Sequence, residues 1–341
     1  MATPITVIPG DATDHSITKV VVLIRDRVEL TSQDAKAEIK ELDGPDGKVM
    51  RVGVIDVPSF YLDTRAKYRG DRNYKSTTRD VRKLLAELEE KNVDGIVMDL
   101  RRNGGGSLDE AIQLTGLFID SGPVVQIKDF MGKVDVENDP DPRMVYNGPL
   151  LVLTSVFSAS ASEIFSSAIQ DYGRGVVVGA KSTHGKGTVQ NVVPLQNLLT
   201  RKLDKHFPED IAGALKLTTH KFYRVSGGST QHKGVEPDVV LPSPYDGMKV
   251  KEEELDHALG WDEIDSVRHK QYDQVAQYID MLKTNSMKRI DKDPEFRYVR
   301  EDLARLEKQR EENRVSLNLE KRLAEREENK KLHLAGIPRG V

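Results

Sequence analysis

Residues 157–165, with the sequence FSASASEIF, place serines at every second position: Ser158, Ser160 and Ser162. A serine hydroxyl can act as a nucleophile in acyl transfer, or it can cap a helix by accepting a hydrogen bond from a free backbone N–H. Capping accounts for one serine, but not for the alanines that keep the side chains short on both sides of Ser160. A hydroxyl at a helix start, flanked by small residues, is open to a substrate, and the helix dipole favours negative charge beside it. Nucleophile and cap both remain open for Ser160 on these residues alone.

A second unusual segment, DLRRNGGGS at residues 99–107, follows a short apolar strand pattern. Its glycines, Gly104, Gly105 and Gly106, free the backbone to adopt positive φ and to turn N–H groups outward. A tight turn would need one glycine, whereas three indicate that a ligand approaches bare backbone. N–H groups aimed at an oxyanion are worth ~3–4 kcal/mol in a transition state. A phosphate cradle is the alternative, but GGGSLDEA lacks the Lys-Ser/Thr pair of a P-loop.

A serine nucleophile needs a base, and histidine is the usual one. The chain has eight histidines, none of which stands in a distinctive setting. Lysine is the other option, provided that burial lowers its pKa from ~10.4 towards ~7 so that a neutral amine is available. The segment THGKGTVQ at residues 183–190 places Lys186 between two glycines, after an apolar strand pattern. A lysine in a solvated turn is the alternative interpretation.

The elements that must position these segments alternate between strand and helix. Apolar runs predict strands at 93–100, 149–155 and 175–180, and helical spacing predicts helices at 77–91, 108–119 and 161–172. This alternation is typical of α/β crossover units, whose sheets bind ligands at the carboxyl ends of the strands. We therefore expect the glycine loop and the serine loop at the same edge of one sheet.

Length and composition narrow the class of protein. A chain of 341 residues predicts two domains or one large domain with appendages, and after Pro244 the sequence becomes helix-patterned and rich in charges of both signs. The absence of cysteine excludes a thiol nucleophile, cysteine-ligated zinc and disulfides. A net charge of −4 gives no electrostatic basis for binding nucleic acid. No apolar run approaches the ~18 residues of a membrane helix, and the first residues lack a signal-peptide pattern.

Taken in order, the motifs resemble those of the carboxyl-terminal processing peptidases, in particular the tail-specific protease branch. The motifs are DLRRNGGG, SASASEIF, QDYGR, GKGTVQ and GGSTQHKGVEPD, and the resemblance extends to ALGWDEIDSV and KDPEFRYVREDLARL near the C-terminus. It implies an α/β fold with a crotonase/ClpP-like protease core at 35–245 and a helical C-terminal extension at 246–341. Residues 1–34 are expected to be the remnant of a PDZ-type domain and a linker strand.

The resemblance also assigns a role to each residue of a Ser/Lys mechanism. Ser160 corresponds to the nucleophile, Lys186 to the general base, and Gln190 to the residue that orients the lysine amine. Asp171, in QDYGR, corresponds to a position described as part of a charge relay. Because a close carboxylate would raise the pKa of the lysine, a structural role for Asp171 is the alternative.

The implied oxyanion hole combines a backbone N–H of Gly105 or Gly106 with that of Ala161. Two features depart from the family pattern. GAKSTHGKG carries one residue more than the usual spacing before Lys186, and only what resembles the last strand of a PDZ domain precedes the core.

The resemblance predicts a serine endopeptidase that recognises exposed apolar C-terminal tails and needs no metal or cofactor. Its partners would be protein or peptide substrates together with an adaptor or lipoprotein, in the periplasm, without nucleic acid and without a membrane span. The extension is expected to add stability or substrate shape rather than chemistry. Two other classes remain as alternatives: a crotonase-like enzyme acting on acyl-CoA thioesters, and a non-catalytic peptide-binding scaffold.

Overall fold

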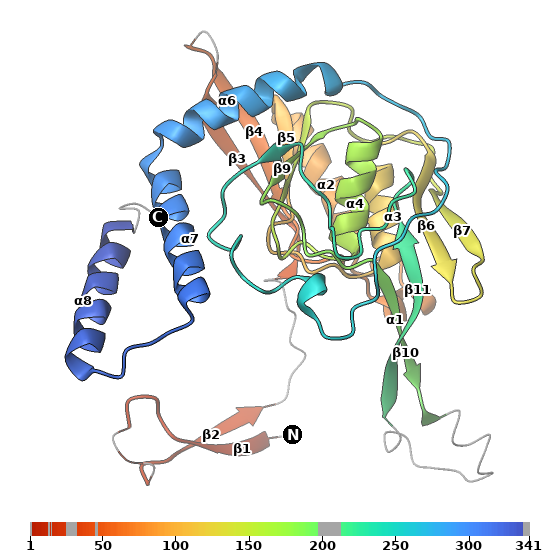
Figure 1. Ribbon diagram of the computed structural model, residues 1–341. Coiled ribbons are helices and arrows are strands. Elements are labelled where there is room, and N and C mark those ends of the chain that lie inside the picture. Colours follow the sequence, from red (N-terminus) through yellow and green to blue (C-terminus); the bar gives the residue numbers. More distant parts are fainter. Residues whose placement is uncertain are drawn as a thin grey trace. The chain divides into compact units, whose positions relative to one another are not determined.

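The computed structural model describes residues 2–12, 14, 16–24, 33–44, 47–196 and 213–336 (Figure 1). The chain divides into two compact units, Met1–Asp34 and Ala35–Val341. In the first unit, β1 (Ala2–Val7) and β2 (Lys19–Ile24) pair as an antiparallel hairpin. All further elements belong to the second unit.

The second unit is built around a sheet with the strand order β12-β9-β8-β5-β4-β3. Its strands are β3 (Lys36–Asp43), β4 (Val49–Asp56), β5 (Gly95–Asp99), β8 (Leu150–Thr154), β9 (Val176–Gly179) and β12 (Val239–Val240). Neighbouring strands are parallel except for β3, which runs antiparallel to β4. The predicted α/β alternation is confirmed, and the carboxyl ends of β5 and β8 lie at one edge, where the glycine and serine loops begin.

Helices cover both faces of this sheet (Figure 1). The face that carries the site is covered by α2 (Thr77–Glu90), α3 (Leu108–Gly116) and α4 (Ala161–Asp171). A short helix, α1 (Thr64–Tyr68), precedes α2 in the chain. Serine caps begin α2 and α3, since Ser76 accepts a hydrogen bond from the Arg79 N–H and Ser107 from the Glu110 N–H. Phe118 and Phe165 pack edge to face at a centroid distance of 5.8 Å within the main core.

A second sheet, with the order β10-β11-β6-β7, is antiparallel throughout. Its strands are β6 (Gly122–Asp129), β7 (Val134–Asp139), β10 (Thr188–Pro194) and β11 (Ala214–Tyr223). The sequence patterns did not predict β6 and β7; β7 is largely exposed and alternates apolar with charged residues instead of carrying an apolar run. The sheet matters for the site because β10 leaves directly from the loop that contains Lys186.

The C-terminal region is helical only in its second half. Its helices are α6 (Ile279–Lys292), α7 (Pro294–Glu312) and α8 (Leu319–Gly336), preceded by the 3-10 turns η3 (Glu252–Glu254) and η4 (Ala276–Tyr278). Residues 255–275 run without helix and bond to loops of the core, for example through the Trp261 indole N–H and the Ser229 carbonyl, 2.9 Å apart. Leu282 of α6 packs against Val176 and Val178, on the sheet face opposite α4.

Candidate active site

The outer serines of the FSASASEIF segment hold its loop in place. The Ser158 hydroxyl donates to the Leu100 carbonyl at 2.7 Å and accepts from the Ser155 N–H at 2.9 Å. The Ser162 hydroxyl donates to the Asn103 carbonyl at 2.8 Å. Both side chains are fully buried. These bonds fasten the serine loop to the glycine loop and explain why hydroxyls flank the central serine.

Ser160 occupies a strained backbone conformation at the N-cap of α4. Its φ of 57° and ψ of −113° lie in a region that residues with a Cβ rarely adopt, at a typical cost of about 1–3 kcal/mol. A sharp turn from strand to helix of this kind presents a nucleophilic hydroxyl at the edge of an α/β sheet. Gly105 lies directly behind it, since a Cβ there would come within 2.9 Å of the Ser160 Cβ. A larger residue at 105 would push the serine out of position.

Several of the residues predicted from sequence line one open cleft of about 470 Å³. The lining includes Ser160, Ala161, Gly106, Lys186 and Gln190, and it is completed on its apolar side by Leu108, Ile164 and Phe222. Two predicted residues, Gly105 and Asp171, are not part of the lining. The glycine loop, the serine loop and the segment around Lys186 therefore meet at one surface, although they are distant in sequence.

The backbone of the glycine loop distinguishes between the two candidate oxyanion donors. The Gly105 N–H donates to the Asn103 side-chain oxygen at 2.8 Å, so it is already engaged. Gly106 lies opposite Phe60 in an isolated parallel bridge. The two hydrogen bonds of this bridge involve the neighbours of Gly106: the Phe60 N–H donates to the Gly105 carbonyl, and the Ser107 N–H donates to the Phe60 carbonyl. The N–H of Gly106 itself therefore points away from Phe60, since alternate backbone groups face opposite sides of an extended strand.

Ala161 supplies the second candidate donor. It is the first residue of α4, where backbone N–H groups have no partner within the helix. Neither the Ala161 N–H nor the Gly106 N–H donates to another residue within the described ranges. Both residues line the cleft beside Ser160. The arrangement can place two N–H donors near a developing negative charge.

Lys186 lies in the loop between β9 and β10 and is half-buried. Burial lowers the pKa of its ammonium group, and the positive charge of Lys216 lowers it further, whereas Glu252 and Glu163 act in the opposite direction. Lys216 extends from β11 into the same cleft. Sequence analysis missed Lys216, because β11 pairs with β10 only in the folded sheet, where Val192 lies opposite it. The lowered pKa favours the neutral amine that a base requires.

Glu163 connects the serine loop to the lysine loop, and sequence analysis did not single it out. Its fully buried carboxylate accepts hydrogen bonds from the Ser160 N–H at 2.7 Å and the Lys186 N–H at 3.0 Å, both at Oε2. Oε1 accepts from the Gly185 N–H at 2.7 Å and the Thr183 hydroxyl at 2.6 Å. Burial raises the pKa of Glu163 to about 7, while these four donors act to lower it. The available signal in the sequence was an acid at the third helical position after a serine, which predicts a capping box.

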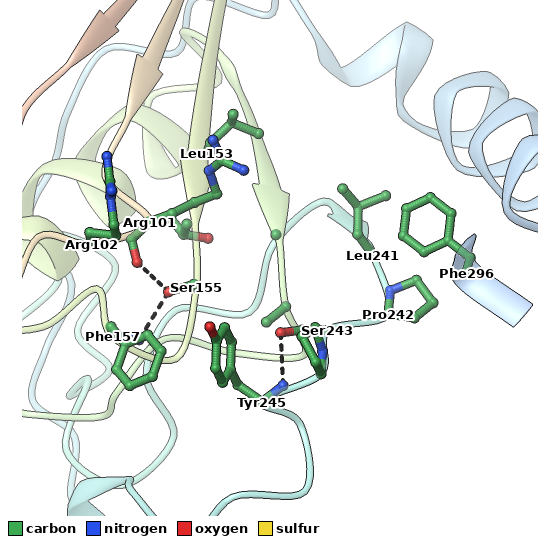
Figure 2. Close-up of a pocket in the computed structure, with 14 residues that line it drawn as sticks. Arg101, Arg102, Leu153, Ser155, Phe157, Leu241, Pro242, Ser243, Tyr245 and Phe296 are labelled. Atoms are coloured by element: carbon green, nitrogen blue, oxygen red, sulfur yellow. Dashed lines mark hydrogen bonds between the residues drawn. The ribbon is translucent and has the colours of Figure 1, made fainter. Parts of the chain in front are cut away.

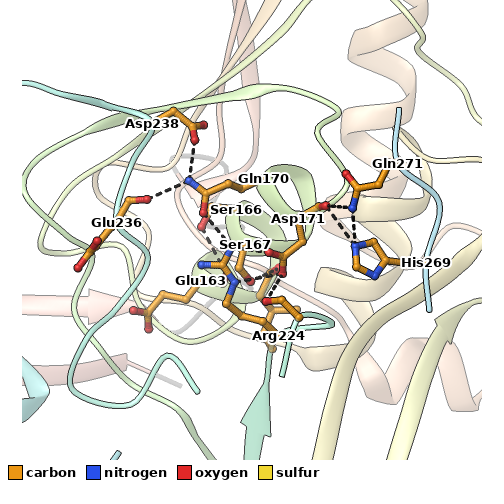
Figure 3. Close-up of polar contacts among 12 residues, drawn as sticks. Glu163, Ser166, Ser167, Gln170, Asp171, Arg224, Glu236, Asp238, His269 and Gln271 are labelled. Atoms are coloured by element: carbon orange, nitrogen blue, oxygen red, sulfur yellow. Dashed lines mark hydrogen bonds and ion pairs between the residues drawn. The ribbon is translucent and has the colours of Figure 1, made fainter. Parts of the chain in front are cut away.

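Asp171 is the last residue of α4 and lies beside Arg224 (Figure 3). Ser160 caps the other end of this helix, and at 1.5 Å per residue the two are about 16 Å apart. The Asp171 carboxylate pairs with Arg224, at 2.5 Å from Oδ1 to Nη2 and 3.1 Å from Oδ2 to Nε, and accepts from the Ser226 hydroxyl. Its backbone carbonyl accepts from the Gln271 side-chain NH₂ group at 2.8 Å. This geometry favours the structural alternative for Asp171.

A larger hollow of about 740 Å³ lies on the other side of the same two loops (Figure 2). Its walls include Phe157 and Tyr245, in edge-to-face contact at 4.9 Å, and the side chains of Arg101 and Arg102. The Ser155 hydroxyl in this lining donates to the Arg101 carbonyl, and Arg101 is paired with Asp99. The hollow contains none of the predicted site residues, so size alone does not identify the reactive cleft.

Among the described residues, no group of three or more His, Asp and Glu side chains is placed to hold a metal ion. Within the same residues, no helix combines the length and apolar character needed to cross a bilayer.

Comparison with known families finds two matches along the chain. Residues 51–241 match the model of peptidase family S41, and residues 245–336 match the C-terminal domain of tail specific protease. The first match contains the whole candidate cleft. The second begins just before the turn that contains Glu252.

Individual proteins show the same similarity. The chain is 38% identical over 317 residues to a tail-specific protease of Haemophilus influenzae, covering 91% of this chain and 42% of that protein. It is 32% identical over 254 residues to a carboxy-terminal-processing protease of Bartonella bacilliformis, covering 66% and 55%. A solved photosystem II D1 C-terminal processing protease superposes with a TM-score of 0.49 at 24% identity, covering 71% and 55%. The chain thus spans about half the length of these relatives.

Replacing Glu163 by Gln should slow labelling of Ser160 by a fluorophosphonate at least tenfold. An amide offers one oxygen acceptor in place of two and turns an NH₂ group towards N–H donors, so both loops lose their fixed positions. Glu110→Gln is the matched control, since Glu110 is an equally buried carboxylate that accepts from the Ser76 hydroxyl and the Thr78 N–H, away from the cleft. Equal labelling rates of the two variants, each corrected for folded fraction, would contradict this role.

Replacing Asp171 by Asn should lower the free energy of unfolding by about 3 kcal/mol, because it leaves the largely buried Arg224 guanidinium without its counter-charge. Urea denaturation measures this loss, with the exposed Asp120→Asn as control. Labelling per folded molecule should remain within a few-fold of wild type. A fully folded Asp171→Asn protein that fails to label would show that the residue acts in the chemistry.

Proposed function

Because the chain belongs to peptidase family S41, we propose that it is a serine endopeptidase with Ser160 and Lys186 as its catalytic pair. One observation carries the proposal: the strained N-cap serine, the half-buried lysine and two backbone N–H donors line the same cleft. Neither the acyl-CoA alternative nor the scaffold alternative calls for a serine and a lysine placed together in this way.

The proposed reaction begins with the neutral amine of Lys186 taking the hydroxyl proton of Ser160 as its oxygen attacks the scissile carbonyl carbon. The carbonyl oxygen becomes an oxyanion, which the N–H groups of Gly106 and Ala161 stabilise. The Lys186 ammonium then returns the proton to the leaving amine as the C–N bond breaks, leaving an acyl-enzyme. Water, deprotonated by Lys186, hydrolyses that ester and restores both residues.

The surroundings of Lys186 support a base that works near neutral pH. Burial and the Lys216 charge both disfavour the ammonium form. Gln190 lies opposite Thr218 in the β10–β11 pairing and lines the cleft, which is consistent with its proposed role of orienting the amine. Asp171 is proposed to stabilise the C-terminal end of α4 by pairing with Arg224, and to take no part in proton transfer.

The substrates are proposed to be proteins with exposed apolar C-terminal tails. This proposal is supported by the names of the relatives, a tail-specific protease and a carboxy-terminal-processing protease, and by the apolar wall of the cleft at Leu108 and Ile164. Periplasmic location, an adaptor or lipoprotein partner, and a PDZ-type origin for residues 1–34 belong to the same proposal. So does the division into a protease core at 35–245 and a C-terminal extension at 246–341.

Ser160→Ala should abolish cleavage of an unfolded reporter protein with an apolar C-terminus, by roughly 10⁴-fold or more, because the nucleophile is lost. Lys186→Arg should be equally inactive, since a guanidinium keeps the charge but cannot accept a proton at working pH. Ser167→Ala is a suitable control, because its hydroxyl bonds only within α4. Cleavage by Ser160→Ala at a rate near wild type would refute the assignment.

The pH dependence of cleavage provides an independent test of the base. Activity should rise with pH through an apparent pKa below the ~10.4 of a free lysine, because the deprotonated amine is the active form and burial disfavours its ammonium. His184→Ala should retain most activity if lysine is the base. An inactive His184→Ala together with an active Lys186→Arg would replace the Ser/Lys mechanism by a histidine-based one.

A further inference from the structure

We propose that Glu252, in the segment that matches the C-terminal domain of tail specific protease, is a positioning residue that fastens this segment to the lysine loop and sets the charge environment of Lys186. The inference rests on the proposed function, in which Lys186 is the base. It gives the C-terminal region a direct influence on the chemistry, beyond the stability or substrate shape expected from the sequence.

A buried glutamine forms the first connection. The Gly187 N–H, next to Lys186, donates to Gln231 Oε1 at 2.7 Å. Because a backbone N–H can only donate, the amide oxygen of Gln231 must face Gly187, and its NH₂ group must face the other way. That NH₂ group donates to Glu252 Oε1 at 3.2 Å. Gln231 is fully buried, so this chain of hydrogen bonds has no ready substitute in water.

A second connection runs through His184. The Glu252 N–H donates to the His184 carbonyl at 3.1 Å, and the His184 N–H donates to the Ser158 carbonyl at 3.0 Å. The other carboxylate oxygen, Glu252 Oε2, lies 3.6 Å from His184 Nε2. Glu252 thus contacts the lysine loop through both its backbone and its side chain, and through His184 it reaches the serine loop.

The position of the carboxylate also matters electrostatically. The Glu252 side chain is only 12% exposed, so water screens its charge poorly. The titratable groups around Lys186 come from four elements: Lys216 from β11, Glu163 from α4, His184 from its own loop and Glu252 from η3. On the same turn, Lys251 donates to the Ser182 hydroxyl of the lysine loop at 2.7 Å, and its charge acts on His184. Glu252 and Lys216 therefore act on Lys186 in opposite directions.

This opposition gives a signature that a merely structural role would not produce. A nearby carboxylate stabilises the ammonium form, so removing its charge should lower the pKa of Lys186 and extend activity to more acidic pH. Loss of a purely structural contact would instead reduce activity at every pH. Glu252→Gln removes the charge but keeps the backbone bond to His184 and an oxygen that can accept from Gln231.

The experiment measures the titration of Lys186 by NMR in the full chain carrying ¹³C-labelled lysine, with the Lys186 signal identified by its loss in Lys186→Arg. We expect Glu252→Gln to shift the Lys186 midpoint to lower pH by roughly half to one unit. The acid limb of peptide cleavage should move in the same direction. Glu253→Gln, which changes an acid on the same turn whose side chain is 49% exposed, should leave both unchanged.

Glu252→Asp keeps the negative charge but changes the side-chain contacts, so it distinguishes the effect of the charge from the effect of the hydrogen bonds. Its Lys186 midpoint should stay within a few tenths of a unit of wild type even if activity falls, because the negative charge is kept although its contacts change. A Lys186 midpoint in Glu252→Gln that is unchanged, or shifted to higher pH, would overturn the proposal. The NMR midpoint does not depend on turnover, so this failure is distinct from failure of the proposed function, which active Ser160→Ala would reveal.

Discussion

The site depends on one buried carboxylate. Glu163 has no access to solvent, and an ion of this kind taken out of water costs several kcal/mol unless hydrogen bonds replace its hydration. The four donors come from two loops: the Ser160 N–H on one side, and groups of Thr183, Gly185 and Lys186 on the other. Because Glu163 lies on the helix that Ser160 caps, moving the lysine loop away removes three of the four donors from a buried carboxylate, so the two loops are held together. The nucleophile and the base of the proposed mechanism are fixed relative to each other through their backbones.

The strain at Ser160 becomes understandable within this arrangement. A residue with positive φ and an unfavourable ψ persists only when its surroundings over-determine it. Here the Ser160 N–H is bound by Glu163, Gly105 packs against its Cβ, and the buried hydroxyls of Ser158 and Ser162 fix the residues on either side. The three alternating serines therefore have different roles: the hydroxyls of Ser158 and Ser162 hold the loop, and Ser160 lines the cleft.

The sequence predicted the α/β alternation and most elements around the site because these depend on local patterns. Ser160, Lys186 and the glycine loop could be singled out because they stand in unusual local sequences after apolar strands, whereas Gln190 was named only through the family resemblance. The roles of Glu163, Lys216 and Glu252 could not, since each depends on a contact between segments far apart in the chain. Asn103 illustrates the same limit, because only its bond to the Gly105 N–H indicates which glycine is free to donate.

Amide hydrogen exchange on the wild-type protein tests the central claim most directly. If one carboxylate holds both loops, the N–H groups of Ser160, Gly185 and Lys186 should exchange slowly, with protection close to that of the core strands, and should open in a single cooperative step. Independent opening of the two loops, or exchange of any of these amides near the rate of an unprotected loop, would contradict the account.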